Sequence, residues 1–360
     1  MIQRVQIVFL VCIMSGGFVY LLYPKLIISM TEGGHWAVIL TQGLLQMVFM
    51  LIFKKGLDYF PNKDVIDIFR QVGKWVAFIF LVPFAFVLTT LVGFGLRSHT
   101  DQINLIFLIR TPNWAILALF VFISAFGAIK GLETILRSSV IVFIIVNLII
   151  LFIAFTGMSN FDFHNALPAW PSSLHFLWSA KFNYLTGFSP LLFLGFVPSE
   201  KNMRYGQLFL VWTYVTILIL LIVYFPLLIF GQETAVTLRY MVVKAVDTVD
   251  LNWFVFSRQT LFFGITLISF TIILNAVMLW QIGQLMQKIF NSQRTTPSYW
   301  IVAFSIIAYF MGVFVPNENM VEKLVWVSTG AHSVLVILIT FFTLIYGVIH
   351  RRRMASYEKK

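Results

Sequence analysis

Two polar, glycine-rich segments interrupt long apolar runs, and the peptide groups freed at such breaks can bind a small molecule. Ser15-Gly16-Gly17 lies near the centre of the run Val5–Met30, and Thr186-Gly187-Phe188-Ser189-Pro190 lies near the centre of Leu174–Val197. Glycine weakens a helix and proline lacks the amide donor, so we expect both helices to be broken there. Each break leaves amide and carbonyl groups unpaired. Such groups attract the carboxylate and the ammonium of a zwitterion.

A purely structural interpretation is open for each break taken alone. Gly16 and Gly17 are also typical of a surface on which another helix packs closely, and Pro190 could simply kink its helix. Asn275, in the middle of the run Gln259–Gln287, is a further candidate ligand residue that could equally bond between helices. We expect His332 to bond between helices, and Lys25 to extend toward the membrane surface.

The sequence contains no arrangement typical of an enzyme or a cofactor site. His-x-x-x-His, Cys-x-x-Cys and a phosphate-binding glycine loop are all absent. Cys12 is the single cysteine, which excludes an intrachain disulfide and a cysteine-rich metal site. We therefore expect no catalytic residues, no metal site and no cofactor.

Composition shows where these segments lie. Of the 360 residues, 60% are hydrophobic and only 11% are charged, whereas soluble domains carry roughly 25% charged residues. We predict an all-α polytopic membrane protein whose apolar runs form ten transmembrane helices. Besides the two interrupted runs, the predicted spans are Trp36–Phe53, Trp75–Leu96, Pro112–Ile129, Ser138–Gly157, Gln207–Phe230, Gln259–Gln287, Tyr299–Val315 and Glu322–Ile349.

The basic residues predict the orientation. If both termini are cytoplasmic, 17 of the 25 lysines and arginines lie on the inner side, as the positive-inside rule requires. The net charge of +11 then reflects topology, and we expect no nucleic-acid partner. Two connections should form short helices: one helix capped by Asn62 at the inner interface, and one or two helices within Gln232–Asn252 over the outer mouth.

The ten spans divide into two halves of five within a single transmembrane domain, 1–360. Repeat one covers 5–157, repeat two covers 174–349, and the tail 350–360 is cytoplasmic. Because five is odd, the second half enters the membrane from the opposite side, which makes an inverted repeat. The two breaks then occupy the first helix of each half, a pattern that points to a binding site.

This order of spans and breaks resembles the amino acid/polyamine/organocation transporter superfamily, with its LeuT-like 5+5 inverted repeat and broken helices 1 and 6. Within it, the chain is most similar to the B subunits of endospore nutrient germinant receptors. The segments that carry this resemblance are Tyr59-Phe60-Pro61-Asn62-Lys63, Thr111-Pro112, and Gly131-Leu132-Glu133 with Arg137.

The resemblance implies a membrane subunit that recognises a small nutrient germinant, typically an amino acid, in the inner membrane of a dormant spore. It would assemble with a larger A subunit and a lipoprotein C subunit. Where transporters of the superfamily often have an acidic residue, this chain has Ser189. A secondary amino-acid transporter and an ion conduit remain alternatives. The implied ligand-binding residues are Ser15, Gly16, Gly17 and Phe18 in the first break, and Thr186, Gly187, Phe188, Ser189 and Pro190 in the second.

Overall fold

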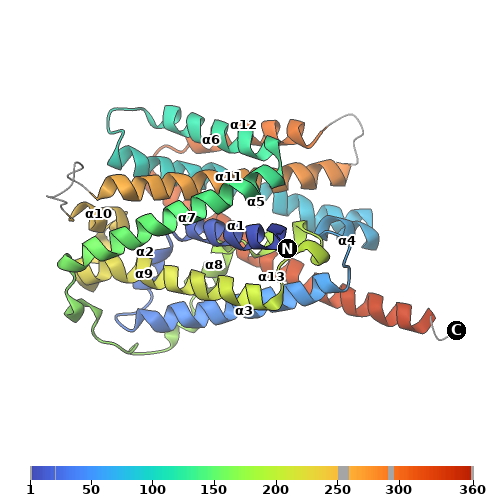
Figure 1. Cartoon of the computed structure of the whole chain (residues 1–360), viewed down its shortest axis with the longest axis horizontal. Helices are drawn as coiled ribbons and strands as arrows, with labels where there is room; N and C mark the ends of the chain where they lie inside the picture. The colour runs from blue at the N-terminus through green and yellow to red at the C-terminus, as the bar shows by residue number, and fades with distance from the viewer. Residues whose placement is uncertain (1, 21, 250–258, 291–295, 358–360) are drawn as a thin grey trace.

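The computed structural model confirms an all-helical protein. It describes residues 2–20, 22–249, 259–290 and 296–357, in which there are thirteen α-helices, several short 3-10 helices and no strand. The long helices run side by side along the molecule, with α4 and the C-terminus at one end and α10 at the other (Figure 1). These two ends are called the α4 end and the α10 end below.

Seven of the described helices are long and apolar enough to cross a membrane. Each carries one of the predicted spans, so the protein is a multi-pass membrane protein. They are α3 (His35–Asp58), α5 (Lys74–Ile106), α6 (Asn113–Lys130), α7 (Leu132–Gly157), α9 (Tyr205–Thr237), α11 (Thr260–Phe290) and α13 (Glu318–Tyr357).

The other three predicted spans are shorter or broken, so the prediction of ten full-length spanning helices is not met within the described residues. Span nine is α12 (Pro297–Val313), and span one is divided between α1 (Ile2–Val19) and α2 (Tyr23–Ile28). Span six consists of α8 (Ala180–Leu185) followed by 3-10 helices at Thr186–Phe188 and Leu191–Phe196. The repeat boundaries 5–157 and 174–349 stay a prediction.

The first break lies later in the chain than the sequence predicted. Helix α1 continues through Ser15, Gly16 and Gly17 to Val19, and the amide of Tyr20 still donates to the Gly16 carbonyl at 3.1 Å. The prediction of a break at Ser15-Gly16-Gly17 was therefore wrong, although span one is broken before α2.

Close packing explains why glycines stand inside α1. A Cβ atom at Gly16 would lie 2.6 Å from the Phe270 ring, and one at Gly17 would lie 2.9 Å from the Leu274 side chain. Both neighbours belong to α11. The two glycines let α11 approach α1, which is the structural alternative that the sequence left open.

The second break lies where the sequence predicted it. Helix α8 ends at Leu185, residues Thr186–Phe188 form one tight turn, and Ser189 is extended with φ −108° and ψ 132°. Pro190 follows and has no amide donor for a continuing helix.

Both connections predicted to form short helices contain one. Helix α4 (Val65–Val72) has Asp64 as its N-cap, whose side chain accepts from the Asp67 amide at 2.9 Å; Asn62 was the wrong cap. Helix α10 (Met241–Asp247) lies at the opposite end of the bundle (Figure 1). The remaining 3-10 helices are Met158–Asn160, Phe163–Ala166, His175–Trp178 and Ser199–Lys201.

The second break depends on close contact with α13, which yields a stability prediction. A Cβ atom at Gly187 would lie 2.0 Å from the Thr329 carbonyl oxygen. We expect Gly187→Ala to destabilise the protein by about 1–3 kcal/mol, because the backbone of α13 must move. Thermal melting in detergent measures the effect. Gly206→Ala is the control, since nothing lies within 4 Å of that position; equal melting temperatures for the two variants would contradict the prediction.

Candidate ligand-binding site

The second break separates two small cavities. Ser189 and Pro190 line both of them. The first cavity lies toward α1, α3 and α9, and the second lies toward α1, α5, α11 and α13. The residues at 189 and 190 thus form a thin wall between two spaces inside the bundle.

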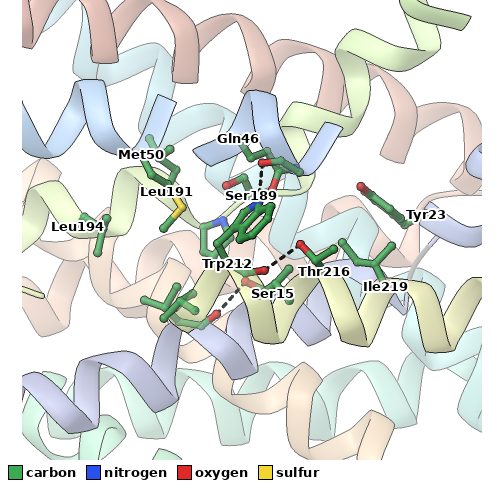
Figure 2. A pocket seen from close by; sticks show the side chains of 15 residues that line it. Ser15, Tyr23, Gln46, Met50, Ser189, Leu191, Leu194, Trp212, Thr216 and Ile219 are labelled. Carbon is green, nitrogen blue, oxygen red and sulfur yellow. Dashed lines mark hydrogen bonds between the residues drawn. The ribbon is translucent and has the colours of Figure 1, made fainter. Parts of the chain in front are cut away.

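The first cavity is partly polar and holds about 30 Å³, which is room for about two water molecules. Ser15 of α1, Gln46 of α3 and Thr216 of α9 face it together with Ser189. Figure 2 shows these side chains around the indole of Trp212, with Tyr23 at one end and Leu194 at the other.

Side chains of α3 bind the groups freed at the break. Gln42 Nε2 donates to Thr186 Oγ1 at 3.0 Å, and Gln46 Nε2 donates to the Leu185 carbonyl at 3.4 Å. The Oε1 atom of Gln42 is buried without a hydrogen-bond partner. Main-chain and side-chain polar groups of the break are therefore held by a neighbouring span, as the membrane interior requires.

The second cavity is smaller, about 10 Å³, and its wall is mostly apolar. The ring of His332 stacks on Phe84 with a centroid distance of 6.0 Å and lies 6.3 Å from Phe18. His332 Nδ1 lies 2.7 Å from the Gly187 carbonyl oxygen. Because a carbonyl only accepts, Nδ1 carries the hydrogen, and Nε2 of the neutral ring is left as an acceptor. The expected interhelical role of His332 is thus seen, and the residue also lines the cavity.

The structure places part of the predicted set at the cavities. Ser15 lines the first cavity, Phe18 lines the second, and Ser189 and Pro190 line both. Phe188 packs edge-on against Phe18 and Tyr23 at 6.5 and 5.5 Å. These residues come together from α1, α2 and the second break.

The other predicted residues have packing or local contacts. Gly16 and Gly17 face α11, and Gly187 faces α13. Asn275 donates to the Thr271 carbonyl of its own helix at 2.7 Å, its Oδ1 is buried without a partner, and it lines neither cavity.

Several cavity residues were missed by the sequence analysis. Gln46, Thr216 and Gln281 are polar residues in the middle of apolar spans, and they line one cavity or the other. Their position within apolar spans could have indicated them, because polar side chains in a membrane helix usually face the protein interior. The spans alone did not show which helices would meet.

Ion pairs close the bundle at the α10 end. Lys25 Nζ lies 3.1 Å from Glu322 Oε1 and joins α2 to α13. Arg239 lies 2.9 Å from Glu318 and joins the segment after α9 to the start of α13. Lys25, which was expected to extend toward the membrane surface, is paired with Glu322.

A polar cluster, in which Lys54 and Ser199 are buried, closes the α4 end. Lys54 donates to Ser199 Oγ at 2.8 Å and also pairs with Asp58. Asp58 accepts from Ser199 Oγ and, at 2.9 Å, from the Tyr205 hydroxyl. The cluster ties α3 to the chain after the second break and to α9.

A second contact at this end joins α11 to α4. Lys288 Nζ lies 2.8 Å from Asp67 Oδ2 and also pairs with Asp64. Burial raises the pKa of the Asp64 carboxyl, although the Lys288 ammonium and the Asp67 amide oppose that rise. The two cavities therefore lie between contacts that tie the helices together at both ends of the bundle.

Comparison with known proteins places this architecture. A family model described as spore germination protein matches residues 1–321. The chain belongs to the spore germination protein family. This family membership confirms the resemblance found in the sequence.

Two relatives in Bacillus subtilis (strain 168) carry the same description. Spore germination protein YndE is 26% identical over 147 residues, which is 40% of this chain and 40% of YndE. Putative spore germination protein YfkT is 19% identical over 230 residues, 63% of this chain and 64% of YfkT. The aligned stretches therefore span less than two thirds of either relative.

Solved transporters share the fold. MhsT, in a crystal structure with L-phenylalanine, has a TM-score of 0.66 at 12% identity over 92% of this chain and 87% of MhsT. The Eremococcus coleocola manganese transporter has a TM-score of 0.63 at 12% identity, over 94% of this chain and 78% of that chain. At such low identity, the likeness shows the fold alone, and that fold is the predicted LeuT-like one.

The cluster at Lys54 generates a second stability prediction. Lys54→Ala removes the cation that pairs with Asp58 and donates to Ser199 Oγ. It also leaves space at a position whose side chain is only 7% exposed. We expect a loss of about 1–3 kcal/mol, measured as a lower melting temperature in detergent. Lys55→Ala, at an exposed neighbouring position, should change stability by about 0.5 kcal/mol or less. Similar melting temperatures for both variants would show that the cluster does not hold this end together.

Proposed function

We propose that this spore germination protein is the nutrient-binding subunit of a germinant receptor in the spore inner membrane. The observation that carries the proposal is the broken sixth span, whose Ser189 and Pro190 separate two cavities inside a transporter-type fold. In this proposal both termini are cytoplasmic, the α10 end faces outward, and larger A and lipoprotein C subunits complete the receptor.

An amino acid is the ligand that this site suits best. Freed peptide groups and the hydroxyls of Ser15 and Ser189 can bind its charged ends, and the aromatic rings of the second cavity can take an apolar side chain. The fold shared with MhsT, which was crystallised with L-phenylalanine, supports this choice.

His332 supplies the acceptor for the ligand's ammonium. Transporters of the superfamily often have an acidic residue for this at the position of Ser189. Its Nδ1 hydrogen is committed to the Gly187 carbonyl, so Nε2 can accept a hydrogen bond from the ligand's ammonium. A neutral acceptor binds an ammonium more weakly than a carboxylate does. This arrangement suits a sensor that must release its ligand.

Binding requires the closed bundle to open. The cavities hold only one or a few water molecules, so a ligand must favour a conformation in which they are larger, and it shifts the equilibrium by its difference in affinity. The short helix α2, held to α13 by Lys25 and Glu322, is the element whose movement would open the α10 end.

Filling the wall between the cavities tests the proposal. We expect Ser189→Leu to abolish germination with amino acids and to weaken their binding by about tenfold or more, because its side chain enters the ligand space. The measurements are spore germination and calorimetric binding to purified protein.

Ser138→Leu is the matched control, at an exposed position of α7. His332→Gln is a second variant, which keeps an acceptor in a different geometry and should weaken binding less than His332→Leu. Normal germination of Ser189→Leu spores with normal protein levels would overturn the receptor role.

Secondary amino-acid transport is the second candidate function. It is favoured by the contacts that join the helices at both ends of the bundle, with the two cavities between them. Alternating access includes a form in which both ends are closed. Uptake of labelled amino acids into liposomes under sodium or proton gradients would support transport, and binding without uptake would favour the receptor.

A further inference from the structure

An apolar groove runs between α6 and α12. These two helices lie together at one edge of the bundle (Figure 1). The volume of the groove is about 410 Å³, within the range of small-molecule sites. The groove is lined by Ala118, Val121, Phe122, Ala125, Phe126 and Ile129 of α6, and by Val302, Ser305, Ile306 and Tyr309 of α12.

The shape of the groove follows from side-chain size. Ala118, Ala125 and Ser305 are small, whereas Phe122 and Phe126 stand beside them and are 69% and 55% exposed. The groove residues of each helix recur at spacings of three and four, so they form one face of α6 and one face of α12. The result is a surface groove with aromatic walls that is open along its outer side.

The lining of the groove is almost entirely apolar, so little in it would select a polar occupant. None of its lining residues is charged. Ser305 Oγ already donates to the Ile301 carbonyl at 2.6 Å, and the Tyr309 hydroxyl is the other polar side-chain group of the lining. A hydrocarbon chain fits such a surface, because it loses no hydrogen bonds on entering.

Lys130 places a cation at one end of the groove, next to Ile129. The ammonium of Lys130 lies 5.3 Å from the centroid of the Phe126 ring, so the side chain folds back toward the groove. Lys130 is exposed and forms no ion pair with any described residue. The acid nearest along the chain, Glu133, lies 3.9 Å from Arg137 instead. An apolar groove that ends at an unpaired cation matches an acyl chain attached to an anionic headgroup.

We propose that this groove binds one acyl chain of an anionic phospholipid, whose phosphate pairs with Lys130. The bound lipid fills the space between α6 and α12 and fixes their separation. The site is independent of the nutrient pocket, because it shares no residue with either cavity.

Native mass spectrometry of the detergent-purified chain tests the headgroup contact. The protein is titrated with phosphatidylglycerol and with phosphatidylcholine of identical acyl chains. We expect phosphatidylglycerol to bind about fivefold more tightly, which is the preference expected from one lysine. Lys130→Gln should remove this preference and Lys130→Arg should keep it. Lys55→Gln, the control at an exposed lysine of α3, should also keep it. A preference that survives Lys130→Gln would overturn the proposal.

Blocking the groove tests the acyl-chain contact. Ala125→Trp and Val302→Trp fill it from α6 and from α12, and both should reduce binding of the two lipids alike. Leu119→Trp, on α6 but outside the groove and 56% exposed, should bind lipid as the unmodified chain does. Unchanged binding in both groove variants would contradict the proposal. A photo-crosslinking amino acid at position 122 should yield lipid adducts in native membranes, whereas an adduct of protein mass would show that a partner helix occupies the groove.

Discussion

The structure depends on one requirement: peptide groups inside the membrane must find partners within the protein. The break in the sixth span leaves peptide groups without helical partners, and side chains from other parts of the chain bind them. The Leu185 carbonyl is bound by Gln46, the Gly187 carbonyl by His332, and the Leu194 carbonyl by Asn202. The candidate ligand site is the place where this repair leaves space, at Ser189 and Pro190.

Close approach of backbones makes the repair possible. Gly187 lies against the Thr329 carbonyl of α13. Because the two backbones are so close, the His332 ring of α13 can hydrogen-bond to the Gly187 carbonyl. Gly16 and Gly17 likewise allow α1 and α11 to approach closely. Small residues therefore set the spacing of the helices, and the polar side chains act within it.

The sequence predicted the helical class, the spans and the second break, because these follow from long apolar runs and from a proline. It misplaced the first break, since a glycine inside a helix costs only about 1 kcal/mol and packing against α11 offsets that cost. The capping residue of α4 and the pairing of Lys25 with Glu322 were also missed. Both depend on which segments meet in space, and local composition carries no record of that. For the same reason, the mid-span polar residues Gln46 and Thr216 could be noticed but not assembled into one cavity.

Helix α13 contacts the α10 end, the second break and the α4 end of the bundle. Near its start, Glu322 pairs with Lys25; in its middle, Thr329 and His332 contact the second break; farther along, Tyr346 stacks on Phe60 beside α4. Glu322 and His332 are ten residues apart, or about 15 Å along one continuous rod. A stiff rod transmits a tilt along its whole length, so a force applied at the α10 end would displace the groups that contact the Gly187 carbonyl without any intermediate element.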